Sequence, residues 1–171
     1  MTRDELIKTL KEDLKVQKEV IAVKAMQQPP AYVPHYQGQA TPGMCALVGE
    51  ILKSGAAWYA TKDNLGCFEA LTGTGTCENM PRDKYLEFMI EQNQSYPMHQ
   101  DAETLKTYYG RVDNFFRHPN VDGTGIAVGP LAAIADPDLV LLFVTPHQAD
   151  ILNRCRAYRG DFTRGFGGMG V

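Results

Sequence analysis

The sequence has no excess of positive charge, because 17 basic side chains stand against 20 acidic ones and the formal net charge is −3. Proteins that gather nucleic acid or anionic lipid over long range need a positive field, which this composition does not produce. The sequence also has no apolar run near the roughly 18 residues that cross a bilayer. These absences predict a protein with neither nucleic acid nor a membrane among its partners.

The N-terminal segment lacks the apolar core of a secretory signal, because charged residues run throughout MTRDELIKTLKEDLKVQKEV. We therefore expect a cytoplasmic protein. Thiols stay reduced in that compartment, so the four cysteines of the chain do not indicate a disulfide framework.

Sequence motifs of several common catalytic sites are missing as well. No serine lies in a nucleophile elbow, and neither H-E-x-x-H nor a paired-carboxylate motif occurs, so hydrolase activity has no support. The glycine-rich segment GTGIAVGP opens an expected strand instead of following one, and RGFGGMG has no helix after it. Neither segment therefore offers the helix N-terminus of a phosphate-binding loop.

What the sequence does contain is enough apolar material for one core, since 44% of its 171 residues are hydrophobic. Strand and helix patterns alternate, which predicts a single α/β domain over residues 1–171, layered, with a mixed central sheet flanked by helices. Helices are expected from Thr2 or Asp4 onward and over residues 44–55, 82–93, 102–118 and 147–160. Strands are expected over residues 19–26, 57–61, 125–134 and 138–146.

The two C-terminal strand patterns differ from the others in their apolar continuity. Residues 125–134 and 138–146 are almost uninterrupted apolar runs, which is typical of strands buried on both faces. We therefore expect these two strands to be adjacent and central in the sheet.

Three cysteines, Cys45, Cys67 and Cys77, lie in one stretch that is rich in turn-forming residues. Thiolates are soft ligands for zinc, iron or an iron–sulfur cluster, and Cys45 is expected in the first turn of a helix, where the dipole favours a thiolate. The spacings match no short C-x₂-C hook. A second interpretation therefore stays open, in which the cysteines are small buried hydrophobic residues.

A group of aromatic residues favours binding of a small molecule instead. The proline-rich loop after residue 28 carries Tyr32 and Tyr36, which together with Trp58 can line an apolar pocket that this loop closes. His147 follows an expected buried strand, at the end of the sheet where α/β proteins bind ligands.

Two arginines of the last expected helix are a further candidate for ligand binding. Arg156 and Arg159 are helical neighbours that can share a carboxylate or a phosphate group. A solvated last turn of the helix is the alternative.

Several segments together resemble the uncharacterised family numbered 169 among the domains of unknown function, found mostly in archaea and anaerobic bacteria. The segments are IAVKAM, MCALVGEILKSG, ATKDNLGC, GIAVGPL and DLVLLFVTPHQADILNRCRAYRG, which span most of the chain. The resemblance implies a cytoplasmic α/β protein of unassigned biochemistry, with family cysteine turns at Cys45 and Cys67. It also implies that a C-terminal segment bearing cysteine and glycine, present in family members, is absent here.

Two functional hypotheses follow. In the first, a protein of anaerobic metabolism holds an iron–sulfur cluster or a single thiolate-bound metal ion through Cys45, Cys67 and Cys77. In the second, the chain is a small-molecule-binding or accessory subunit without catalytic activity of its own. The expected partners are a small-molecule ligand or a redox partner protein, with a homo-oligomer as a further option.

Overall fold

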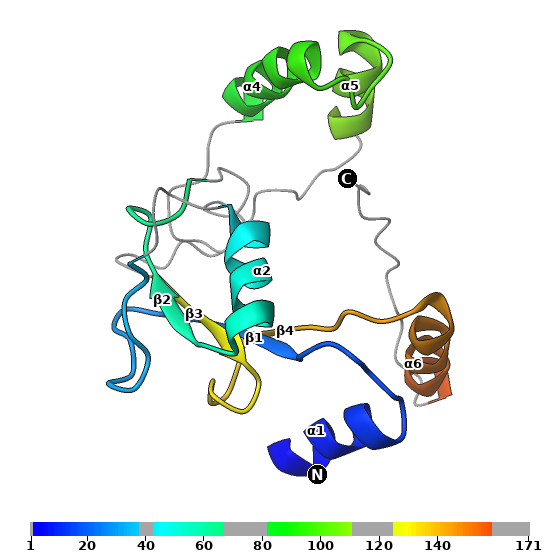
Figure 1. Cartoon of the computed structure of the whole chain (residues 1–171). Coiled ribbons are helices and arrows are strands. Elements are labelled where there is room, and N and C mark those ends of the chain that lie inside the picture. The colour runs from blue at the N-terminus through cyan, green and yellow to red at the C-terminus, as the bar shows by residue number, and fades with distance from the viewer. Residues whose placement is uncertain (1, 38–42, 67–81, 111–124, 159–171) are drawn as a thin grey trace.

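The computed structural model describes residues 2–37, 43–66, 82–110 and 125–158 (Figure 1). These ranges form a four-stranded sheet in the order β2-β3-β1-β4, and every pairing between these strands is antiparallel. The strands are β1 (Ile21–Met26), β2 (Trp58–Ala60), β3 (Gly125–Pro130) and β4 (Leu139–Leu141). The helices are α1 (Arg3–Glu12), α2 (Met44–Ser54), α4 (Arg82–Ser95), α5 (Ala102–Gly110) and α6 (Pro146–Tyr158). The predicted α/β fold is therefore confirmed.

The two faces of the sheet bury different sets of side chains, because successive strand residues point to opposite sides. On one side, Ile21 of β1 clusters with Leu47 and other apolar residues of α2. On the other side, Ala22 clusters with Leu10 of α1 and with residues that flank the strands. We call these sides the α2 face and the α1 face.

The loop after β1 extends the sheet along β2 by a parallel pairing. His35 and Tyr59 form an isolated parallel bridge, in which the Tyr36 amide donates to Tyr59 O at 2.8 Å and the Tyr59 amide donates to Pro34 O at 2.9 Å. Parallel pairing thus accompanies the antiparallel ladders. The alternation along this short stretch places His35 against the Tyr59 ring and Tyr36 against Trp58.

Local capping residues set the start of α1 and the end of α2. Thr2 caps α1 in a reciprocal box, since its hydroxyl accepts from the Glu5 amide at 3.2 Å and the Glu5 carboxylate accepts from the Thr2 amide at 2.6 Å. Gly55 ends α2 with a left-handed φ of 68°, and its amide donates to Ile51 O. Glycine adopts this conformation without the steric cost that a Cβ brings.

The expected adjacency of the two apolar C-terminal strands is wrong, because β1 lies between β3 and β4. The strand expected over residues 125–134 ends at Pro130, and β4 is a three-residue strand at the edge of the sheet, with Leu139 54% exposed. An uninterrupted apolar run indicates that its residues are favoured in the interior, but it does not specify which strand pairs with it. The backbone of β1 offers one edge to each of these two strands, and both pair with it.

Helices α4 and α5 pack on one another and form their own apolar cluster around Tyr85, Met89, Leu105 and Tyr109. Asn93 braces the turn between them, since its side-chain oxygen accepts from the amides of residues 98 and 99, each at 2.8 Å. Figure 1 shows this helical pair set apart from the sheet. Across the described ranges, no helix is both long and apolar enough to cross a membrane.

Candidate functional site

The cysteines that motivated a metal centre are only partly within the described residues. Cys45 lies in the first turn of α2, as expected, and its side chain is exposed, as is that of Cys155 in α6. Cys67 and Cys77 fall outside the described ranges. Among the residues that are described, no three histidines, cysteines or carboxylates come together as a metal-binding group. Thiolate coordination by Cys45, Cys67 and Cys77 therefore stays a prediction.

The aromatic residues expected around one pocket lie in three different places. Tyr36 is buried on the α2 face, where its hydroxyl donates to Glu50 at 3.0 Å and its ring meets Trp58 edge-on. Tyr32 lies on the α1 face and is 63% exposed. His147 is exposed at the start of α6. The structure does not bring Tyr32, Tyr36 and His147 together, and their part in binding a ligand stays a prediction.

Tyr36 is held as a neutral phenol by its surroundings. Burial, then the hydrogen bond to Glu50 and the charge of that carboxylate, raise the pKa of Tyr36. This residue thus ties the loop to α2 and belongs to the core.

The arginine pair expected on the last helix is only half described. Arg156 is exposed near the end of α6, and Arg159 lies outside the described residues. The nearby Arg154 pairs with Asp150 at 2.7 Å along the solvent side of the same helix. Such exposed pairs along a helix contribute little to stability.

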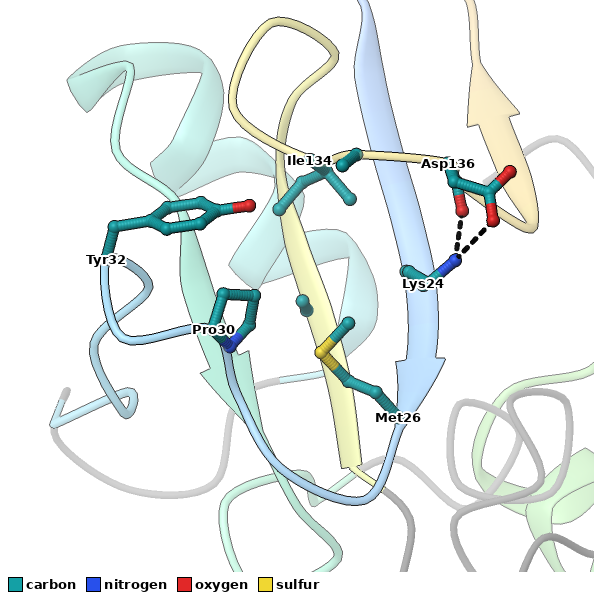
Figure 2. Close-up of a pocket in the computed structure, with 8 residues that line it drawn as sticks. Lys24, Met26, Pro30, Tyr32, Ile134 and Asp136 are labelled. Carbon is teal, nitrogen blue, oxygen red and sulfur yellow. Dashed lines mark hydrogen bonds and ion pairs between the residues drawn. The ribbon is translucent and has the colours of Figure 1, made fainter.

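The structure instead shows a cavity of about 280 Å³ on the α1 face of the sheet (Figure 2). Its floor comes from β1 and β3. Along β1, every second side chain points to the α1 face: Ala22 belongs to the apolar cluster of that face, as does Val20 just before the strand, and Lys24 and Met26 line the cavity. Ala127 is the contribution of β3. The loops after β1 and β3 form the walls. The lining residues are Lys24, Met26, Pro30, Tyr32, Ala127, Ile134, Ala135 and Asp136.

Lys24 is the charged group of the cavity floor. Its side chain is 24% exposed, and its Nζ donates to both the backbone oxygen and the carboxylate of Asp136, with 3.1 Å to Oδ2. Asp136 has a left-handed φ of 46°, an uncommon conformation for a residue other than glycine that aspartate tolerates better than most. Two residues further on, the Asp138 carboxylate accepts from the Ala25 amide at 2.8 Å and so fixes the loop to β1.

Beside Lys24 and Asp136, the cavity has a third polar group, the Tyr32 hydroxyl. Figure 2 shows the Tyr32 ring extending over the cavity toward Ile134, opposite the Lys24–Asp136 pair, with Met26 and Pro30 on the side between them. Within the described part of the chain, this hydroxyl has no hydrogen-bond partner. The cavity thus combines a largely apolar lining with three polar residues, Lys24, Tyr32 and Asp136, as small-molecule sites do.

A second hollow, of about 540 Å³, lies between α2 and the β4 edge. It is apolar, and the exposed Cys45 lies on its rim beside Gly49. The remaining lining residues are Met44, Val48, Leu52 and the stretch 140–143.

Comparison with known proteins assigns the family. Residues 9–164 match the family of domain of unknown function 169, described as uncharacterised ArCR. The chain belongs to this family. No curated protein and no solved structure gives a significant match.

The sequence pattern missed Lys24 and Asp136 as functional candidates. A signal was present in IAVKAM, where one lysine interrupts an apolar strand whose first three residues are buried. Its partner lies 112 residues away in the sequence, so the pairing became visible only in the folded chain.

Proposed function

We propose that this member of the family is a small-molecule-binding protein or accessory subunit whose ligand occupies the cavity on the α1 face. The observation that carries the proposal is the arrangement of Lys24 and Tyr32 at a hollow whose other lining is largely apolar. A volume of about 280 Å³ is near the small end of organic ligand sites, which start at roughly 300 Å³. The expected ligand is therefore compact. A cytoplasmic location is part of this proposal.

The test is a fragment screen by NMR on the full chain, with isotope-labelled methionine and alanine methyl groups. Fragments that bind in the cavity should shift the Met26 and Ala127 methyl signals. Tyr32→Ala should weaken that binding while leaving the melting temperature within a few degrees, because the ring is mostly exposed. His147→Ala is the matched control, since this residue is also exposed but does not line the cavity.

A screen without any shift at Met26 or Ala127 would remove the cavity as a ligand site. Loss of binding in His147→Ala but not in Tyr32→Ala would instead move the site to the start of α6. Tyr36→Ala should lower stability strongly, because Tyr36 is a buried residue of the α2 face, so it cannot report on binding.

A thiolate metal centre in a protein of anaerobic metabolism is the second candidate function. It is favoured by Cys45, which is exposed in the first turn of α2, where the N-cap residue Gly43 has no side chain that could cap the helix amides. The proposed cofactor is an iron–sulfur cluster or a single metal ion, which a redox partner protein would serve. A shell of four ligands needs Cys67 and Cys77 or groups from a partner or second copy.

Anaerobic purification followed by elemental analysis and an absorption spectrum tests this candidate. Cys45→Ser or Cys67→Ser should abolish bound metal, whereas Cys155→Ser, on α6, should retain it. Preparations of the parent chain free of zinc and iron would argue against the centre.

A further inference from the structure

The charge arrangement in the cavity indicates which chemical class it binds. Building on the proposed function above, we infer that the cavity binds a compact organic monocarboxylate, which Lys24 anchors and for which Asp136 is the displaceable counter-ion. The inference rests on the third proton of Lys24, which has no acceptor among the described residues, on the exposure of the Asp136 carboxylate and on the absence of a second cation among the described lining residues.

Lys24 has capacity for an additional acceptor. An ammonium group donates three hydrogen bonds, and the two made here both go to Asp136. Three quarters of the Lys24 side chain is buried, which holds its stem against the sheet, while its ammonium group meets Asp136 at an exposed site. A ligand carboxylate in the cavity can therefore accept a charge-assisted hydrogen bond from Lys24.

The Asp136 carboxylate can be displaced from Lys24 by such a ligand. Its side chain is 97% exposed, so its carboxylate can turn into solvent at little cost. The backbone does not need to follow, because the Asp138 amide donates to Val23 O at 3.0 Å and the Asp138 carboxylate holds the Ala25 amide. The Asp136 carbonyl thus keeps its bond to Lys24 when the Asp136 carboxylate turns away and a ligand carboxylate takes over the charge pairing with Lys24.

The remaining walls select the body of the ligand. Met26, Ala127, Pro30 and Ile134 provide apolar contact, and the Tyr32 hydroxyl, on the opposite side from Lys24, can donate to a polar substituent at the far end of the ligand. A single ring or a short branched chain suits a cavity of about 280 Å³. One lysine matches one negative charge, whereas a phosphate dianion would lack a second cation among the described lining residues. Lys24 would repel a cationic ligand.

The experiment compares three probes of similar size and different charge: benzoate, benzyl alcohol and benzylamine. Each is titrated into the full chain, and the Met26 methyl shift gives the dissociation constant. Benzoate should bind about tenfold more tightly than benzyl alcohol, the gain expected for one charge-assisted hydrogen bond. Benzylamine should bind most weakly. Added salt should reduce the advantage of benzoate.

Two variants separate the roles of the charged pair. Lys24→Met should abolish the preference for benzoate and leave the affinity for benzyl alcohol unchanged. Asp136→Asn should increase benzoate affinity severalfold, because it removes the competing carboxylate while asparagine tolerates the left-handed backbone. Lys53→Met is the matched control, since Lys53 is an exposed residue of α2, on the opposite face of the sheet.

Each outcome decides between the two proposals. Equal or tighter binding of benzyl alcohol, with the Met26 shift retained, would overturn the carboxylate inference and leave the cavity as a ligand site. Unchanged benzoate affinity in Lys24→Met would also overturn the carboxylate inference and leave the cavity as a ligand site. If none of the probes shifts Met26, while fragments from the wider screen do, the inference fails and the proposed function stands. If neither the probes nor the fragments shift the Met26 and Ala127 signals, both the carboxylate inference and the proposed function fail.

Discussion

The hydroxyl of Tyr59 accepts a hydrogen bond from the Gly125 amide at 3.1 Å, across a separation of 66 residues. The same hydroxyl lies 3.0 Å from both the Met26 and the Gln27 carbonyl oxygens, to which it can donate. One phenol on β2 thereby joins the start of β3 to the end of β1. The Tyr59 side chain is buried, and its bond with the Gly125 amide lies at a buried site.

Tyr59→Phe should therefore lower the free energy of unfolding by about 1–3 kcal/mol, because it leaves the Gly125 amide without its acceptor in a buried place. Urea unfolding followed by circular dichroism measures the change. Tyr32→Phe is the control and should have almost no effect, because Tyr32 is 63% exposed and its hydroxyl has no partner within the described ranges. Equal effects of the two substitutions would contradict this account.

Gly125→Ala should be destabilising through steric overlap. A Cβ at residue 125 would lie 2.6 Å from both the Tyr59 hydroxyl and the Ala60 carbonyl oxygen, so the buried ring and the β2 backbone would have to shift. We expect a loss of about 1–3 kcal/mol in the free energy of unfolding, as for other overpacked cores. Thermal and urea unfolding should agree on the direction.

Gly49→Ala is the matched comparison, because a Cβ at this position of α2 meets no described atom within 4 Å. Alanine favours the helix over glycine by about 1 kcal/mol. The variant should therefore be more stable than the parent chain. A loss of stability in Gly49→Ala similar to that in Gly125→Ala would mean that steric overlap is not the cause of either.

Asp101 should make stability fall in acid. It precedes α5, and its carboxylate accepts from the Thr104 amide at 2.7 Å. That backbone bond, followed by the bond from the Thr104 side chain, lowers the pKa of Asp101. A lowered folded-state pKa adds stability at pH values above the ordinary aspartate pKa, and this stability is lost as pH falls through the folded-state value.

The pKa of the Asp101 carboxylate can be followed by NMR titration, and α5 helicity by circular dichroism. Asp101→Ala should weaken α5 at neutral pH and remove this part of the acid dependence. Asp101→Asn should keep the cap, since asparagine is also a good N-cap residue, but should lose the pH dependence. An ordinary titration of Asp101 in the folded chain would be the opposing result.

Tyr36 should make the stability of the folded chain fall at alkaline pH, whereas Asp101 makes it fall in acid. Its pKa is raised, first by burial and then by Glu50, so the folded chain holds the phenol proton more tightly than the unfolded chain. The associated stability is complete below the ordinary tyrosine pKa and disappears as pH rises through the raised value. Urea unfolding at several alkaline pH values should show a smaller pH dependence in Tyr36→Phe than in the parent chain. Parallel curves would disprove the assignment.

Local sequence determined the secondary structure that depends on neighbouring residues. Thr2 with Glu5 specifies the start of α1, and Gly55 specifies the end of α2, because capping requires only groups a few residues apart. The family resemblance was also a property of the sequence. The cavity could not be predicted from the sequence, although the sequence does show a single lysine within the apolar β1 segment.

Tertiary structure alone decided which distant segments meet. Apolar residues favour burial wherever it is available, so the runs around β3 and β4 could not show that β1 would pair with both. The α/β alternation likewise did not reveal that Tyr32 and Tyr36 would lie on opposite faces of the sheet. Lys24 and Asp136 meet because antiparallel pairing of β4 with β1 brings the residues just before β4 beside Lys24. A charged pair of this kind depends on strand order and register, which are set by contacts between residues far apart in the chain.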